Sequence, residues 1–199
     1  MMRLGDVAGR GYAIFDTGIG RCGVAWSDAG IVGVQLPEAR EIETRKRLFK
    51  LYPDAREQRP PGDVEIAIEG IVTLLRGEPA DLFDVALDLS GVAAFNARVY
   101  TFTRSIPRGE TITYGEIAAK LRLSGAVHAV AQALARNPFV VIVPCHRVLE
   151  AGGYADRISP YGGVISKRRL LSIEGARGTT ASKTLFDVLL PVAPPRPQG

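Results

Sequence analysis

The sequence of 199 residues has only two cysteines, two histidines and one tryptophan. Two cysteines cannot form a disulfide framework, and four scattered Cys and His residues without a CxxC or HExxH motif are a poor set for a structural zinc site. The longest segment without Asp, Glu, Lys or Arg, 123–135, has 13 residues, whereas about 20 are needed to cross a bilayer. The first residues also lack the apolar segment of a signal peptide. We therefore expect a cytoplasmic protein without a metal site or a membrane-spanning segment.

Apolar residues make up 46% of the chain and charged residues 23%, as in ordinary globular proteins of one or two domains. The net charge of +4 is unevenly distributed. The segment 95–175 holds 11 Lys or Arg and 5 Asp or Glu, which gives it a charge of +6, and the rest of the chain has −2. A basic part beside a slightly acidic part fits a polyanionic partner such as nucleic acid. It fits a merely soluble basic surface equally well, and charge alone favours neither.

The first part of the chain, which ends near residues 90–94, has the pattern of an α+β unit. Apolar runs on either side of Ser27-Asp28-Ala29-Gly30 predict a β-hairpin. Asp63 and Gly77 flank an apolar-periodic segment and are typical of the N-cap and the C′ residue of a helix. The predicted elements are strands within 11–37, helices over 38–51 and 63–76, and a strand over 84–89.

The second part, from Phe95 onward, has a mostly helical pattern. An apolar stripe predicts a helix over 95–106, which the sequence Pro107-Arg108-Gly109 ends. Thr113 and Glu116 have the spacing of a capping box, so a further helix is expected to begin between them, at Tyr114.

This helix, 114–121, and a second one over 126–135 are separated by a short turn that contains Gly125. Two helices joined by a tight glycine-containing turn predict a helix-turn-helix motif. On the second helix, we expect Val127, Val130 and Leu134 to face the core and the side of His128 and Gln132 to face a partner.

The most informative segment follows the second helix. Asn137-Pro138 precedes an apolar run, 139–143, that predicts a buried strand leading to Pro144-Cys145-His146-Arg147. A cysteine beside a histidine can be a nucleophile, because the thiolate is the reactive form and a nearby base or cation favours it. Neighbouring side chains of an extended chain point in opposite directions, so this pair must lie in a bend or communicate through a water. Taken alone, such a cysteine is more often a buried structural thiol, as we also expect of Cys22.

Four segments of the chain resemble one protein family. They are Asn137-Pro138 followed by five apolar residues and PCHRV, GETITYGEIA (109–118), SKRRLLSIEGA (166–176) and RCGVAWSDAGIVGVQLPEA (21–39). Together they make residues 11–176 similar to the O6-alkylguanine-DNA alkyltransferases, and to a bacterial subgroup of them. The resemblance implies an α+β protein of two domains. These are an N-terminal ribonuclease-H-like α/β domain, 1–91, and a mostly helical C-terminal helix-turn-helix (winged-helix-like) domain, 92–176, followed by a tail, 177–199.

The resemblance also implies a DNA repair activity. Such proteins bind double-stranded DNA through the minor groove, flip the alkylated guanine out of the stack and move its O6-alkyl group irreversibly onto a cysteine of their own. This makes them methylated-DNA–protein-cysteine S-methyltransferases that work once. The resemblance implies no cofactor, and a monomer.

The matching positions imply a role for each residue of the catalytic site. Cys145 is the alkyl acceptor, His146 takes its proton through a water, and Glu174 orients His146. Tyr114 crowds the 3′ phosphate and donates to the leaving base. Asn137 supports the turn between the second helix of the helix-turn-helix motif and the segment that leads to Cys145.

For the guanine pocket, the resemblance implies two alternative sets of residues. The backbone carbonyls of Cys145 and Val148 match those that read the guanine amino group. In the loop 152–163, counting forward from Cys145 makes Ser159 the donor to O6, and counting back from Glu174 makes it Tyr161. Neither register supplies the usual aromatic wall of the alkyl pocket.

The DNA-contacting face departs from the family pattern. Its candidate residues are His128, Gln132, Arg136, Arg98 and Arg122, with Lys167 and Arg168 as further phosphate contacts. His128 stands where the family has an arginine that fills the space of the flipped base, and histidine is shorter and mostly neutral at pH 7. Ala131 stands where a glycine is common. We predict weaker DNA binding and slower repair than in a typical member.

Other interpretations stay open at this point. A non-catalytic alkyltransferase-like lesion sensor, or a diverged paralogue with weakened DNA binding, would look similar, although such sensors replace the reactive cysteine. A regulatory helix-turn-helix protein would not need the PCHR segment, and a cysteine hydrolase would need a separate His and an Asn or Asp orienter. In the tail, the apolar segment 184–192 could pack on the body or contact a partner, and we favour packing. We expect the Pro-rich end to be disordered or polyproline-like.

Overall fold

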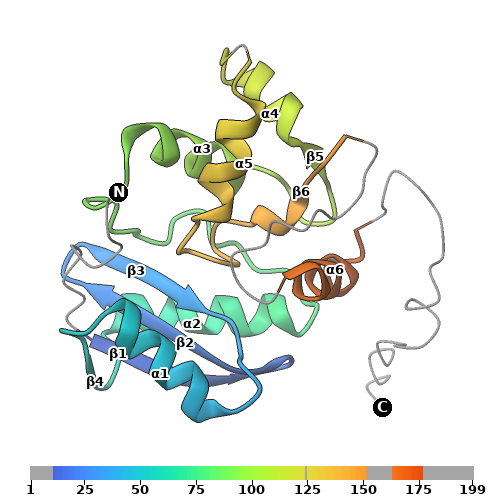
Figure 1. Cartoon of the computed structure of the whole chain (residues 1–199). Helices are drawn as coiled ribbons and strands as arrows, with labels where there is room; N and C mark the ends of the chain where they lie inside the picture. The colour runs from blue at the N-terminus through green and yellow to red at the C-terminus, as the bar shows by residue number, and fades with distance from the viewer. Residues whose placement is uncertain (1–10, 124, 152–162, 177–199) are drawn as a thin grey trace, which may run out of the picture.

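The structure, a computed structural model, describes residues 11–123, 125–151 and 163–176. It is an α+β fold in which a four-stranded mixed sheet lies on one side of a group of helices (Figure 1). In the described ranges, no helix is long and apolar enough to cross a membrane. The elements are β1 (Gly11–Thr17), β2 (Gly20–Ser27), β3 (Gly30–Gln35), α1 (Glu41–Leu51), β4 (Arg56–Glu57), α2 (Gly62–Leu75), α3 (Ala94–Arg104), β5 (Ile112–Thr113), α4 (Tyr114–Lys120), α5 (Val127–Ala135), the 3₁₀ helix Cys145–Arg147, β6 (Val148–Leu149) and α6 (Gly163–Glu174).

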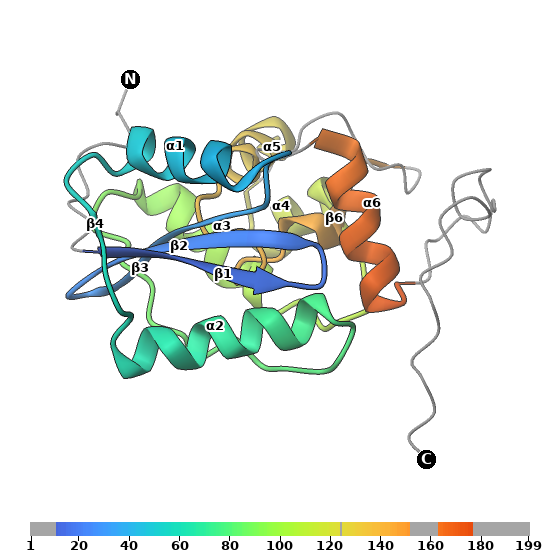
Figure 2. The same ribbon diagram turned by 90° about the horizontal axis from the view of Figure 1, so that it is seen from below.

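The sheet has the strand order β3-β2-β1-β4. The first three strands are antiparallel neighbours, and β4 pairs with β1 in the parallel direction. The hairpin expected between β2 and β3 is confirmed, with Ser27 paired to Gly30. Helices α1 and α2 lie on opposite faces of the sheet (Figure 2), which buries the apolar side chains of β2 and β3 on both sides.

Both helices that cover the sheet begin elsewhere than the sequence indicated. Helix α1 begins at Glu41 rather than at Glu38. Glu38 precedes the helix, and its backbone N–H donates to the hydroxyl of Thr44 (3.1 Å). The prediction that Asp63 caps α2 is wrong, because the N-cap position is taken by Pro61. Asp63 instead lies in the first turn, where the helix dipole favours a negative charge. Gly77, with a φ of +88°, follows α2 at C′ as expected.

The strand predicted over 84–89 is also wrong. Only Leu87 forms a bridge, an isolated parallel one with Ile31 of β3. The carboxylate of Asp88 accepts hydrogen bonds from the hydroxyl of Ser27 and from the backbone N–H of Ser90 (2.9 Å). These bonds turn the chain away from the sheet after one bridge, so the alternating pattern never becomes a ladder.

Helices α4 and α5 follow each other along the chain and pack together, as expected for the predicted pair of helices. The predicted capping box is confirmed, because the side chain of Thr113 accepts from the N–H of Glu116 (3.2 Å) and the Glu116 carboxylate accepts from the N–H of Thr113 (2.7 Å). Val130 and Leu134 of α5 are buried as predicted. Val127 is 46% exposed, so its predicted place in the core is wrong, since the first turn of α5 has not yet reached the core.

One hydrophobic core joins the sheet to the helices. Val24 of β2 belongs to the same buried cluster as Val99 of α3 and Val130 of α5. The backbone N–H of Val34 in β3 also donates to the carbonyl of Pro138 (2.8 Å), directly after α5. The segment that leads to Cys145 therefore packs against both parts of the molecule.

Candidate active site

The apolar segment before Cys145 is a compact turn rather than a strand. The strand predicted over 139–143 is wrong, because only isolated bridges form there. The side chain of Asn137 donates to the carbonyl of Val143 (2.9 Å) and accepts from the N–H of Phe139 (2.9 Å). This fully buried amide joins both ends of the turn and takes the place of a strand ladder.

Backbone strain marks the same turn. Val141 has a φ of +77°, a region that a β-branched residue rarely adopts. The turn is closed around it by a hydrogen bond of 2.7 Å from the N–H of Val143 to the carbonyl of Phe139. Strain of this kind persists where the surroundings over-determine the conformation, and it clusters at functional sites. Here it lies four residues before Cys145.

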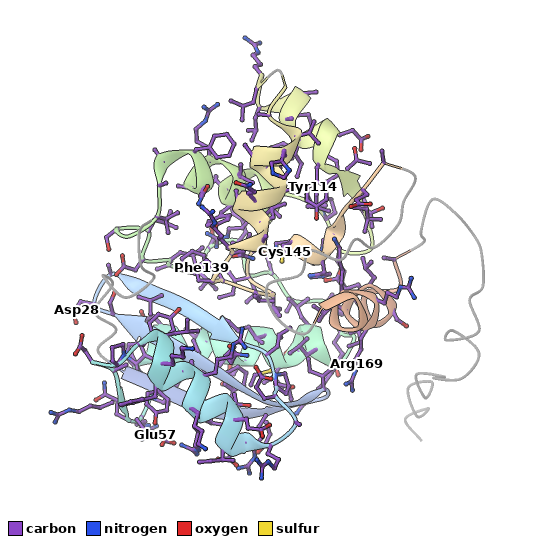
Figure 3. The ribbon with its side chains drawn as sticks, in the orientation of Figure 1. Asp28, Glu57, Tyr114, Phe139, Cys145 and Arg169 are labelled. Atoms are coloured by element: carbon purple, nitrogen blue, oxygen red, sulfur yellow. The ribbon has the colours of Figure 1, made fainter. Side chains whose placement is uncertain are left out.

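Cys145 begins the 3₁₀ helix that follows the turn. The N–H of Cys145 donates to the carbonyl of Val143 (2.8 Å), and the N–H of Arg147 donates to that of Pro144 (2.9 Å). The predicted bend at Cys145 and His146 is therefore confirmed. Cys145 is half-buried and lies at the centre of the molecule, below Tyr114 in the view of Figure 3.

A buried ion-paired network lies beside Cys145. His146 is 3% exposed, and its Nε2 lies 2.8 Å from Oε1 of Glu174 at the end of α6. Arg147 donates to both oxygens of the same carboxylate, from Nη2 (2.8 Å) and Nε (2.9 Å). Its Nη1 donates to the backbone carbonyl of Ile106. The family resemblance predicted the pairing of Glu174 with His146, whereas the contact of Arg147 with Glu174 was not predicted.

The protonation states follow from these contacts. Burial raises the pKa of Glu174, but hydrogen bonds from His146 and Arg147 outweigh burial and lower that pKa to about 2. Burial, offset only in part by Glu174, lowers the pKa of His146 below its ordinary value. Near pH 7, Glu174 is therefore an anion and His146 a neutral imidazole that donates from Nε2. The buried Nδ1 of His146 has no hydrogen-bond partner among the described residues, so this nitrogen can accept a proton.

Tyr114, the first residue of α4, packs against a buried lysine. Nζ of Lys167 on α6 lies 3.5 Å from the hydroxyl of Tyr114 and 5.6 Å from the centre of its ring. Lys167 is 3% exposed, so its predicted role as a surface contact for phosphates is wrong. In the sequence it stands beside Arg168 and Arg169 and looks like one more surface cation, and only the tertiary contact distinguishes it.

Several known proteins are similar to this chain in sequence and in fold. A family model described as the DNA binding domain of 6-O-methylguanine DNA methyltransferase matches residues 94–176. The methylated-DNA–protein-cysteine methyltransferase of Methanothermobacter thermautotrophicus is 37% identical over 153 residues, which are 77% of this chain and 78% of that protein. The chain belongs to the methylated-DNA–protein-cysteine methyltransferase family. Another member, from Mycobacterium bovis, is 43% identical over 128 residues, 64% of this chain and 74% of its own.

Solved structures of the family have the same fold. The crystal structure of Mycobacterium tuberculosis O6-methylguanine methyltransferase matches with a TM-score of 0.65 at 35% identity, over 89% of this chain and 99% of that one. A Mycobacterium tuberculosis OGT crystallised in complex with DNA matches with a TM-score of 0.63 at 33% identity, over 84% and 94% of the two chains.

Three of the predicted DNA contacts lie on or directly after α5. His128 and Gln132 are exposed one helical turn apart, and the amide nitrogen of Gln132 lies 2.8 Å from Nε2 of His128. Arg136 is exposed directly after the helix, whereas Ala131 is buried. The structure thus brings His128, Gln132 and Arg136 to one surface.

Two other predicted DNA contacts, Arg98 and Arg122, meet at the end of α4, and Arg168 is exposed on α6. Arg98 of α3 is exposed, and its guanidinium donates to the carbonyl of Leu121 (3.3 Å) at the end of α4. Arg122 is exposed directly after that carbonyl and has a φ of +55°. Arg98 thus has a structural contact that the sequence did not indicate.

The predicted guanine pocket is described only in part. Val148 is buried in β6, where it pairs with Ile112 of β5. Ser159 and Tyr161 lie outside the described residues, as do the rest of the loop 152–162 and the tail 177–199.

Proposed function

We propose that this protein repairs alkylated DNA by moving the alkyl group of O6-alkylguanine irreversibly onto its own Cys145. Transfer of a methyl group from DNA to a protein cysteine is the reaction for which the family is named. One observation carries the assignment of the acceptor. Cys145 directly precedes a buried, neutral His146 that an ion-paired Glu174 holds at 2.8 Å.

His146 is the proposed base. Its Nε2–H donates to Glu174, which leaves Nδ1 to take the thiol proton of Cys145 through a water. The Glu174 anion then stabilises the imidazolium that forms, while Arg147 keeps the carboxylate ionised and fixed. The products of this step are a Cys145 thiolate and a protonated His146.

The thiolate then displaces guanine from the alkyl carbon. The C–S bond forms on the side opposite to O6 while the C–O6 bond breaks, and the bonding electron pair leaves with the base. The hydroxyl of Tyr114, polarised by Lys167 at 3.5 Å, donates towards the developing charge on O6. Overall, guanine gains the proton that the thiol lost. Since nothing cleaves the thioether, each molecule reacts once.

The helix-turn-helix motif is proposed to contact the DNA. The segment 95–175 carries a charge of +6, and His128, Gln132, Arg136 and Arg122 are exposed on this motif. We propose that the motif enters the minor groove with the target base flipped out. A related OGT crystallised in complex with DNA supports the binding of DNA. Flipping costs a few kcal/mol, which contacts to the phosphates must offset. Val148, and one of Ser159 and Tyr161, are our proposed guanine contacts.

The proposed domain division follows the two architectures. The sheet with α1 and α2 forms the ribonuclease-H-like domain, 1–91, and the helix-turn-helix part forms the second domain, 92–176. The family model supports this boundary, since its match begins at residue 94. We propose that the protein acts as a monomer, because all of the proposed catalytic side chains come from one chain.

A titration of lesion against protein tests the proposal. Increasing amounts of duplex DNA with one O6-methylguanine are mixed with a fixed amount of protein, and the remaining lesion is measured. Repair should stop at one lesion per protein molecule. Cys145→Ala should bind the DNA and repair nothing, while the matched variant Cys22→Ala should still repair one lesion. Repeated turnover, or repair by Cys145→Ala, would contradict the proposal, and tight binding without repair by the wild type would favour the lesion sensor.

A further inference from the structure

A tight turn over residues 107–110 joins α3 to β5. The N–H of Glu110 donates to the carbonyl of Pro107 (3.2 Å), and Gly109 has a φ of +79°, which fits the third position of a type II turn. Arg108 therefore lies at the corner of the turn. Its guanidinium reaches the ends of two helices that the reaction scheme above does not connect.

These two helix ends, of α2 and α6, are capped in the same way. In α6, the N–H of Ala176 donates to the carbonyl of Leu171 (3.0 Å) around Gly175, which has a φ of +67°. Helix α2 ends with the same Schellman motif around Gly77. Such a cap satisfies the earlier carbonyls of the last turn and leaves the final ones to other donors. Both ends carry the partial negative charge of a helix C-terminus.

Arg108 joins the two ends. Its Nη2 donates to the carbonyl of Gly77 and to that of Ile173 (3.1 Å), the last residue but one of α6. Figures 1 and 2 show the end of α2 beside α6, and a Cβ placed on Gly77 would lie 3.4 Å from the carbonyl oxygen of Ile173. A cation between two negative helix ends is favoured electrostatically.

The contact at Ile173 matters because Glu174 comes next. We propose that Arg108 is a positioning residue of the transfer reaction, which fixes the backbone of Glu174 so that its carboxylate holds His146. Arg147 holds the carboxylate itself and is anchored on Ile106 of the neighbouring turn. Glu174 is thus secured at its backbone by Arg108 and at its side chain by Arg147. Only the link to catalysis rests on the proposed function.

The consequence of losing Arg108 follows from the geometry. Without a donor on the carbonyl of Ile173, the last turn of α6 is free to fray, as helix ends do. The distance of 2.8 Å between Glu174 and Nε2 of His146 is then no longer fixed. Since this contact keeps the proton of the neutral ring on Nε2, its loss should mix the two tautomers. A fraction of His146 would then carry its proton on Nδ1, where it cannot accept one from the thiol.

The test compares Arg108→Met with a matched variant, Arg104→Met. Arg104 lines the same cleft of about 650 Å³ as Arg108 and also donates to backbone carbonyls. Its acceptors, Leu82 and Val85 among them, lie in the connection between α2 and α3, and none of them belongs to α6. The readouts are the ¹⁵N chemical shifts of His146 in DNA-free protein, the single-turnover rate of methyl transfer and the DNA dissociation constant.

Arg108→Met should show mixed His146 tautomers and transfer about tenfold more slowly, with unchanged DNA affinity. Arg104→Met should lower the melting temperature but keep the tautomer and the rate. Arg108→Lys, which offers one ammonium group to two carbonyls, should give a smaller change of the same kind, and it serves as the test should Arg108→Met not fold.

Two results would overturn the inference. One is a wild-type tautomer and rate in the Arg108 variants, and the other is an equal loss in Arg104→Met. A wild-type protein that transfers no methyl group, but whose tautomer still shifts in Arg108→Met, would refute the proposed function and leave the positioning of Glu174 intact.

Discussion

The two cysteines of this chain differ in what surrounds them. Cys22 lies fully buried in β2, as the sequence predicted, with the hydroxyl of Thr17 3.6 Å from its sulfur. Burial raises the pKa of Cys22 to about 11. Cys145 is half-buried at the start of a 3₁₀ helix and directly precedes His146, which Glu174 and Arg147 support.

The comparison teaches that the reactivity of the thiol depends on the residues around it. Both residues have the same chemistry as free amino acids, and only Cys145 is followed by a base that a fixed anion orients. The turn before it, which Asn137 holds around the strained Val141, leads into the 3₁₀ helix that begins at Cys145. Reactivity is thus a property of the segment 137–147 and the end of α6 rather than of a cysteine.

The largest expected effect is a difference in labelling rate. Iodoacetamide at pH 7.5 should modify Cys145 of the native protein at least ~100-fold faster than Cys22, because the thiolate is the reacting form and Cys22 is buried with a raised pKa. Peptide mass spectrometry gives the two rates. In urea the two rates should converge, and equal rates in the native protein would remove the basis of the comparison.

Glu174→Gln should remove most of the reactivity that distinguishes Cys145 from Cys22. The neutral amide cannot stabilise a protonated His146, so single-turnover methyl transfer should slow by roughly 100-fold. Because this change leaves the buried guanidinium of Arg147 unpaired, the double variant Glu174→Gln/Arg147→Met serves as the control for folding. Wild-type transfer rates in both variants would show that the relay has no part in the reaction.

Acid should weaken the site in a defined order. The pKa of His146 is lowered by burial, so the transfer rate should stay level as the pH falls from 7.5 to the ordinary imidazole range and drop only below it. Both His146 and Glu174 have folded-state pKa values below their unfolded ones. The stability they contribute is therefore present above the unfolded values and lost as the pH falls through the folded ones. Rates between pH 5 and 8 check the level stretch, and a rate that already halves near pH 7 would contradict it. Urea midpoints must be followed down to about pH 2, where Glu174 takes up its proton in the folded state.

His128→Arg should change DNA binding and leave both thiols as they are. The added charge on the exposed side of α5 should tighten binding to duplex DNA a few-fold and steepen its salt dependence by about one unit. Gln132→Arg, one turn along the same surface, has the same net charge and should gain less at the lesion. Equal affinity in wild type and His128→Arg would show that His128 does not limit binding.

Local signals in the sequence predicted local structure. The capping box of Thr113 and Glu116 and the turn before Gly30 depend on neighbouring residues, and both are confirmed. The run 139–143 was misread as a strand, because its apolar pattern does not show that the Asn137 side chain replaces the ladder.

Long-range contacts were harder to predict. Family resemblance paired His146 with Glu174, but nothing local shows that Arg147 joins them or that Lys167 is buried against Tyr114. These contacts join residues 27 and 53 positions apart, and they exist only once α6 is docked.

The location of the transferred methyl group tests the central claim most directly. The protein is incubated with an excess of duplex DNA carrying one O6-methylguanine. It is then digested, and the masses of its peptides are measured by mass spectrometry. We predict one methyl group per molecule, on the sulfur of Cys145, with Cys22 unmodified. Methyl on Cys22, or an unmodified protein beside intact lesions, would contradict the claim that the surroundings of Cys145 make it the acceptor.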